Sequence, residues 1–130
     1  MGNLKKNAKI YFLLIAIHSL GVGFALIILP SDFLMQFGYH QITEPFFKVQ
    51  GGVFHIVMAI VYYFVFIDPI RNINLIKVTF IAKFIATLFL ISFFVFYDPI
   101  LVVLLSGLGD FLMGFVAFYF YKKLSPSIHE

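Results

Sequence analysis

Four long apolar runs, separated by short polar stretches, organise the chain. They cover about residues 10–29, 45–67, 69–95 and 99–121. Each run is close to or above the roughly 20 residues that a helix needs to cross a bilayer. The pattern predicts an all-α fold, a four-helix transmembrane bundle that forms one domain over residues 1–130.

Prolines mark the predicted helix boundaries. Pro30 ends the first run, and an acidic residue followed by proline precedes each of the other three, at Glu44–Pro45, Asp68–Pro69 and Asp98–Pro99. An acidic N-cap can accept hydrogen bonds from the free amides of the first turn, and proline is well tolerated at the first helical position. We therefore expect helices to begin at these three pairs.

The composition indicates a membrane protein. The chain is 62% hydrophobic and 12% charged, whereas a soluble domain is about half apolar and a quarter charged. It has no cysteine, which excludes disulfides and thiolate metal sites. No basic stripe interleaved with aromatic residues and no nucleic-acid motif is present, so nucleic acid is not an expected partner. The expected partners are membrane lipids, and other membrane subunits or a second copy of the chain.

The basic residues predict the orientation. They cluster before the first run, in the second loop and after the last run, at Lys5, Lys6, Lys9, Arg71, Lys77, Lys122 and Lys123. The first loop and the turn at Asp98 carry mostly acidic residues. By the positive-inside rule both termini lie in the cytoplasm, as expected for a multi-pass protein of a bacterial inner membrane. Tyrosines such as Tyr62 fall near the predicted span ends, as in an aromatic belt.

Each predicted span carries one ionisable residue near its middle: His18, His55, Lys83 and Asp110. At about 1.5 Å per residue the four lie at similar depths, so they are expected to form one central polar layer. A charge at this depth costs at least about 2.5 kcal/mol and normally faces a partner or a cavity. An ion pair between Lys83 and Asp110 is therefore expected.

Small residues share a helix face with each of these four side chains. Gly21 lies three positions from His18, Gly51 and Gly52 lie one turn before His55, Ala86 follows Lys83, and Gly107 and Gly114 flank Asp110. Small residues mark the surfaces on which membrane helices approach each other closely. The pattern predicts that all four polar side chains lie on packing faces.

The layer has several interpretations. The ion pair and hydrogen-bonded histidines can serve only to fix the helix register. Alternatively, the layer is a polar pocket for a small ligand or lipid headgroup, or a proton relay. His18 and His55 could also be axial ligands of a b-type haem. A metal site from His18, His55 and Asp110 fits the ligand chemistry, but no local motif supports it, and no metal is predicted.

A second polar group opens the second span at Glu44, Lys48 and Gln50. Glu44 and Lys48 are four residues apart in the order that favours a surface ion pair. The alternative is an extracytoplasmic mouth to the central layer. In the loop before this group, residues 33–39 are expected to form a short helix in the interface, with a flap over the bundle as the alternative. His40 is expected to be a solvated loop residue.

The segments Leu29–Gly38 and Phe47–Gly52 resemble the DoxX-like group of small bacterial four-helix membrane proteins. In that group a proline ends the first helix, a short apolar loop follows, and a basic residue precedes glycines in the second helix. The resemblance covers about residues 30–63 and the four-span layout, with Lys48 where the group commonly has arginine. It implies a link to membrane redox complexes and quinone chemistry.

This resemblance, together with the polar centre, favours a non-enzymatic inner-membrane protein, either an accessory subunit or a binder of a lipid- or quinone-like molecule at that centre. One alternative is a membrane enzyme acting on a hydrophobic substrate, with His55 or Asp110 as the acid or base. Another is a small proton-coupled transporter.

Overall fold

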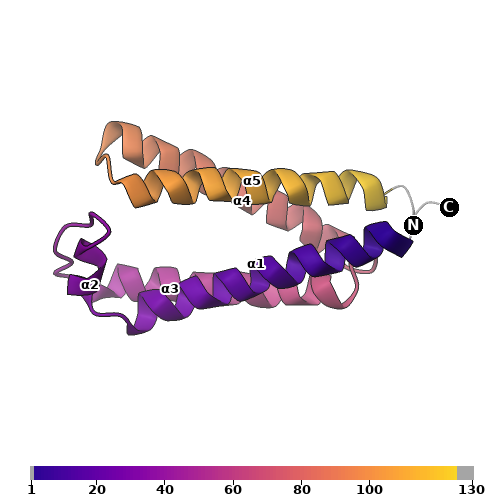
Figure 1. The fold of residues 1–130 in the computed structure, drawn as a ribbon, viewed down its shortest axis with the longest axis horizontal. Coiled ribbons are helices and arrows are strands. Elements are labelled where there is room, and N and C mark those ends of the chain that lie inside the picture. The colour runs from indigo at the N-terminus through magenta and orange to yellow at the C-terminus, as the bar shows by residue number, and fades with distance from the viewer. Residues whose placement is uncertain (1, 126–130) are drawn as a thin grey trace.

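The computed structural model describes residues 2–125, which form helices and no strands. The helices are α1 (Gly2–Ile28), α2 (Ser31–Met35), α3 (Pro45–Ile67), α4 (Ile73–Phe96) and α5 (Leu101–Leu124). Four of them are long and apolar enough to cross a membrane. The predicted all-α, four-helix architecture is thus confirmed. The short helix α2 lies in the first loop (Figure 1).

The long helices are arranged as two pairs (Figure 1). Helix α1 packs along α3, and α4 packs along α5, whereas contacts between the pairs are sparse. We call these the α1/α3 pair and the α4/α5 pair. The start of α1, the end of α5 and the α3–α4 turn lie at one end of the molecule, here called the terminal end, and the two other connections lie at the opposite, loop end.

Glycines bring the two helices of each pair together. A Cβ atom added at Gly52 would lie 2.7 Å from the carbonyl oxygen of Gly23, and one added at Gly23 would lie 2.8 Å from the carbonyl oxygen of Gly52. In the other pair, a Cβ at Gly107 would lie 3.2 Å from the Cβ of Leu90. Such contacts between small residues are typical of membrane helices, where dispersion forces hold packed helices together.

The buried core lies in the half of the molecule nearest the terminal end. It draws on the first half of α1, the second half of α3, the first turns of α4 and the last turns of α5. Its largest fully buried side chains include Phe12, Tyr62, Ile76 and Leu124. All four long helices therefore meet in this half, which we call the closed half.

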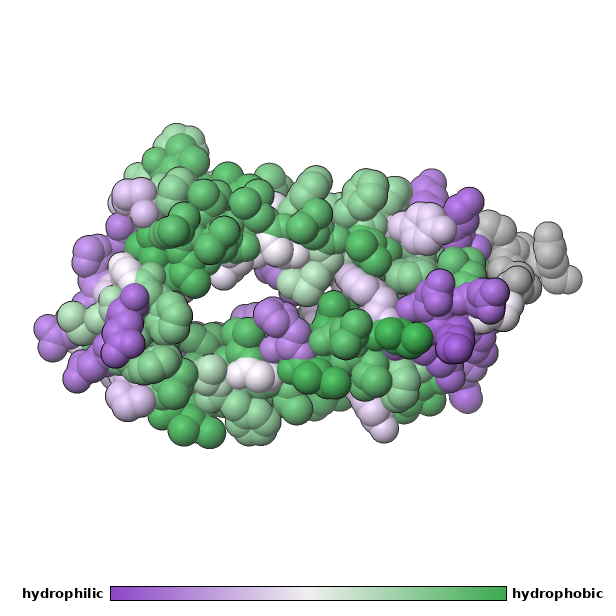
Figure 2. Space-filling view, viewed as in Figure 1, coloured by the Kyte–Doolittle hydropathy of each residue, from purple (hydrophilic) through white to green (hydrophobic). Residues whose placement is uncertain are grey.

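The pairs separate toward the loop end, in what we call the open half. Figure 2 shows an opening between them on this side of the molecule. At the loop end itself, the Nε2 atom of His40 lies 2.7 Å from the Oδ2 atom of Asp98, which joins the first loop to the α4–α5 turn. His40 was expected to be a solvated loop residue; its side chain is exposed, but it has this acidic partner.

Two of the three predicted helix starts are wrong. Helix α3 begins at Pro45 as predicted, although the side chain of Glu44 makes no capping hydrogen bond. Helix α4 begins at Ile73, because Asp68 instead ends α3 and its Oδ1 atom accepts hydrogen bonds from the turn amides of Ile70 (3.1 Å) and Arg71 (3.4 Å). Helix α5 likewise begins after its acid–proline pair.

Candidate functional site: a polar cavity between the helix pairs

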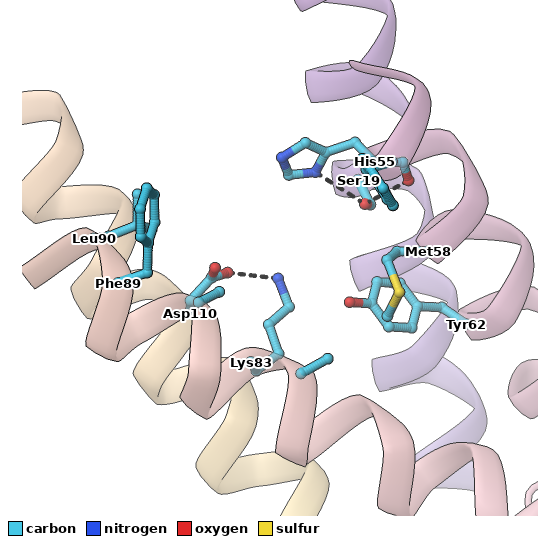
Figure 3. A pocket seen from close by; sticks show the side chains of 11 residues that line it. Ser19, His55, Met58, Tyr62, Lys83, Phe89, Leu90 and Asp110 are labelled. Atoms are coloured by element: carbon cyan, nitrogen blue, oxygen red, sulfur yellow. Dashed lines mark hydrogen bonds and ion pairs between the residues drawn. The ribbon is translucent and has the colours of Figure 1, made fainter. Parts of the chain in front are cut away.

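A cavity of about 240 Å³ lies between the two pairs, next to the closed half. Its polar lining comprises Ser19, His55, Tyr62, Lys83 and Asp110. The rest of its wall is apolar or small, and includes Phe54, Met58, Ala82, Ala86, Phe89 and Leu90. Figure 3 shows the ionised residues on the α4/α5 side and the histidine on the opposite wall.

Lys83 and Asp110 form the expected ion pair, with 2.5 Å between the Nζ and Oδ1 atoms. The side chains are 8% and 16% exposed, so both charges are largely removed from solvent. The pair links α4 to α5 and therefore lies within one helix pair. The ion pair holds α4 and α5 in register but does not join them to α1 and α3.

Small residues around the ion pair let α5 approach α4 closely. A Cβ at Gly114 would lie 3.1 Å from the Cβ of Lys83. The hydroxyl of Thr87 donates to the carbonyl of Lys83 at 2.8 Å and lies 3.3 Å from the carbonyl of Gly107. From the other pair, the Tyr62 ring centroid lies 5.9 Å from the Lys83 Nζ atom, within cation–π range.

His55 lies on the facing wall and is held by α1. The Oγ atom of Ser19 donates to the backbone carbonyl of His55 at 2.9 Å and lies 3.3 Å from its Nδ1 atom. The imidazole is thus oriented by a neighbouring helix, and its ring points into the cavity (Figure 3).

A second cavity, of about 690 Å³, continues from the first toward the loop end. The two share His55, Phe89 and Leu90 in their linings. Glu44 and Lys48 line the outer cavity. The passage therefore runs from the polar centre to the loop end.

Of the three residues in the predicted mouth, Glu44 and Lys48 line the outer cavity and Gln50 does not. Gln50 is exposed and is not part of either lining. The Lys48 Nζ atom does not pair with Glu44; it donates to the carbonyl of Leu29 at 2.5 Å, just beyond the end of α1. A cation at a helix C-terminus is favourable because it meets unpaired carbonyls and the negative end of the helix dipole.

His18 departs from the prediction. Its side chain is exposed and does not line the cavity, and a Cβ atom added at Gly21 on the same face would meet no atom within 4 Å. The packing face of α1 instead carries Ser19 and Gly23, both buried. The spacing of Ser19 and Gly23, four residues apart, is the signal that sequence reasoning missed.

Tyr62 is the other missed residue. Its position near a predicted span end is typical of an aromatic belt, but it is 2% exposed and lies where the cavity meets the closed half.

Outside the spans, burial raises the pKa of Tyr39, which lines the outer cavity. This phenol therefore keeps its proton, and remains a hydrogen-bond donor, at neutral pH.

The structure gives no support to a haem or metal centre built as the sequence suggested. His18 is outside the cavity that His55 lines, so the two histidines do not face one another across it. Within residues 2–125, no group of three His, Asp or Glu side chains is close enough to hold a metal ion.

In the comparisons with known proteins, no protein-family model, curated protein or solved structure matches this chain. The fold and the cavity define the class of protein, an all-α protein with four helices able to cross a membrane and a polar cavity between two helix pairs.

Proposed function

We propose that this protein is a multi-pass membrane protein that binds an amphiphilic small molecule, lipid- or quinone-like, with the polar head at His55, Lys83 and Asp110. The observation that carries the proposal is that these three polar groups line one cavity. They line an open cavity with apolar walls, although the closed half next to it is well packed. Concave, mostly apolar sites with a few convergent polar groups are typical of ligand sites.

An ion pair with a purely structural role would not explain the cavity beside it or the histidine that faces it. A buried pair that only fixes register needs close packing around both charges, because each unpaired oxygen or hydrogen is costly in an apolar medium. Here the pair opens onto the cavity, and an oriented histidine from the other helix pair faces it across the space. Polar groups from both walls are thus available to one ligand.

The geometry gives less support to an enzyme that uses His55 and Asp110 as an acid–base pair. The Oδ1 atom of Asp110 is bonded to Lys83, and the Nδ1 atom of His55 faces Ser19. No hydrogen bond links His55 to Asp110 in the described part of the chain. A binder, or an accessory subunit as the DoxX-like resemblance implies, therefore remains the favoured function.

We also propose that the terminal end faces the cytoplasm of a bacterial cell. All Lys and Arg residues except Lys48 and Lys83 lie at this end, as the positive-inside rule requires. The chain has no cysteine, so single cysteines at Ser31 and Ser125 can report topology without background. In intact spheroplasts, a membrane-impermeant maleimide is expected to label Ser31→Cys and not Ser125→Cys; the reverse would invert the orientation.

Native mass spectrometry of protein extracted gently from its own membrane tests the binding function. A co-purifying small molecule is expected with the wild type and is expected to be lost in His55→Leu. His18→Leu is the matched control, because it removes the same group from an exposed position of α1 outside the cavity lining. Wild-type protein that carries no small molecule, or equal loss in the two variants, would count against the proposal.

A further inference from the structure

We infer that the cavity selects ligands with an uncharged, hydrogen-bonding head group, such as a long-chain alcohol, over anionic ligands with the same chain. The inference rests on the proposed binding function and specifies the ligand class. It follows from the charges that line the two connected cavities.

The formal charges of the lining cancel at each level. In the inner cavity, Lys83 is neutralised by Asp110 at 2.5 Å. In the outer cavity, Lys48 and Glu44 contribute one charge of each sign, and the Lys48 ammonium already donates to the carbonyl of Leu29. With histidine counted as neutral at pH 7, the complete passage carries no net charge.

An anionic head in the inner cavity would lack a free counter-ion. Its charge would leave water and lipid headgroups for a site in which the nearest cation already has a carboxylate partner. Burying a charge without a partner costs several kcal/mol, whereas a hydroxyl only needs its hydrogen bonds replaced. The Nε2 atom of His55 and the Oδ2 atom of Asp110 are left for such bonds, because Nδ1 faces Ser19 and Oδ1 is bonded to Lys83. A neutral head can therefore be satisfied, whereas an anionic one cannot.

The apolar part of the ligand has a place to lie. The cavity wall is formed by residues such as Phe54, Met58, Phe89 and Leu90, and the pairs leave an opening between them in the open half (Figure 2). Because the helices would cross the bilayer, this opening faces the hydrocarbon. A chain can therefore remain in the lipid phase while its head reaches His55.

The test uses two probes with the same chain, 1-hexadecanol and hexadecyl phosphate, added to purified protein in detergent micelles and measured by native mass spectrometry. Hexadecanol is expected to bind the wild type at least about tenfold more tightly, a difference of about 1.4 kcal/mol. The protein has a formal net charge of +3, so non-specific electrostatic attraction would favour the phosphate instead.

A change of charge at the site should change the preference. Asp110→Asn leaves Lys83 without its carboxylate and gives the cavity a net positive charge, so the preference is expected to move toward hexadecyl phosphate. Lys83→Met/Asp110→Asn removes both charges and is expected to restore the preference for hexadecanol. Far-UV circular dichroism and thermal unfolding verify that the variants are folded.

The outcomes separate the inference from the function on which it rests. If hexadecyl phosphate binds the wild type as tightly as hexadecanol or more tightly, and His55→Leu weakens it, the cavity is a ligand site but the inference is wrong. If neither probe binds the wild type better than His55→Leu, the binding function itself is overturned. If Asp110→Asn does not fold, the comparison of the two probes on the wild type still tests whether the cavity prefers an uncharged head group.

Discussion

The closed and open halves of the molecule are built from the same four helices but by different contacts. In the closed half, side chains such as Phe12, Tyr62 and Leu124 fill the space between all four helices. In the open half, each helix packs mainly against its partner, as Gly23 does against Gly52, and a cavity separates the two pairs.

The difference shows how a small membrane protein can hold a cavity without a large structure around it. Lipid is as apolar as leucine, so no hydrophobic force closes a gap between two helix pairs in a bilayer. Close contacts between the two helices of each pair form the walls, and the core of the closed half joins one pair to the other. The polar centre lies at the junction of the two halves, next to the contacts that join the pairs.

The largest expected effect comes from breaking the ion pair at this junction. Lys83→Met leaves the Asp110 carboxylate without a partner and is expected to destabilise the protein by about 3–5 kcal/mol. Lys83→Met/Asp110→Leu removes both charges and should recover much of that loss. Equilibrium unfolding in detergent measures the double-mutant cycle; additive losses would show that the pair is not coupled.

The next effect concerns the wall formed by the α1/α3 pair. Gly52→Ala places a methyl group 2.7 Å from the backbone carbonyl of Gly23, which cannot move without shifting α1. It is expected to cost about 3 kcal/mol. Gly21→Ala is the matched control, since nothing lies within 4 Å of its added Cβ; it should be neutral or stabilising by up to about 1 kcal/mol.

Thermal unfolding of the two glycine variants would measure this difference. Equal effects would mean that α1 and α3 are not held together by close contact at Gly52, and that the open half lacks rigid walls.

Much of the architecture could be predicted because hydrophobic length is a strong signal in a membrane protein. The four spans and the Lys83–Asp110 pair follow from the apolar runs and from the cost of a lone charge in lipid. The helix starts near Asp68 and Asp98 could not be predicted as reliably. A carboxylate before proline can cap a helix, but at Asp68 it instead binds the amides of a turn.

The cavity is the part that the sequence could not reveal. Depth along each helix can be counted, but rotation about the helix axis and the angle between pairs depend on contacts between distant residues. His18 and Ser19 illustrate this: one residue, a rotation of about 100° about the axis, separates an exposed side chain from one that holds His55. Nothing local in the sequence distinguishes four helices packed throughout from four that meet in one half only.

A smaller effect tests the closed half directly. Phe12 is fully buried among the four helices, and Phe12→Ala is expected to cost about 2 kcal/mol, mainly from the cavity that it leaves. Phe89→Ala, in the open half, removes the same ring from a side chain that is 65% exposed and should cost less than about 1 kcal/mol. Detergent unfolding of both variants measures the difference, and equal costs would contradict the division into two halves.

The smallest expected effect lies at the terminal end, where the Lys5 Nζ atom is 3.2 Å from the Oδ1 atom of Asp68 and ties α1 to the α3–α4 turn. The hydrogen bond from Lys5, together with the turn amides, lowers the pKa of Asp68. A lowered folded-state pKa means that this contribution to stability is complete above the ordinary aspartate value of about 3.9 and is lost as the pH falls through the folded-state value.

Thermal unfolding of the wild type should therefore show a small extra loss of stability at acidic pH that Asp68→Asn lacks. The control is Asp32→Asn, which removes a carboxylate at the loop end and leaves the contact between Lys5 and Asp68 in place. If the pH profile of Asp68→Asn matches the profiles of the wild type and of this control, the contact between Lys5 and Asp68 does not contribute to the stability of the closed half.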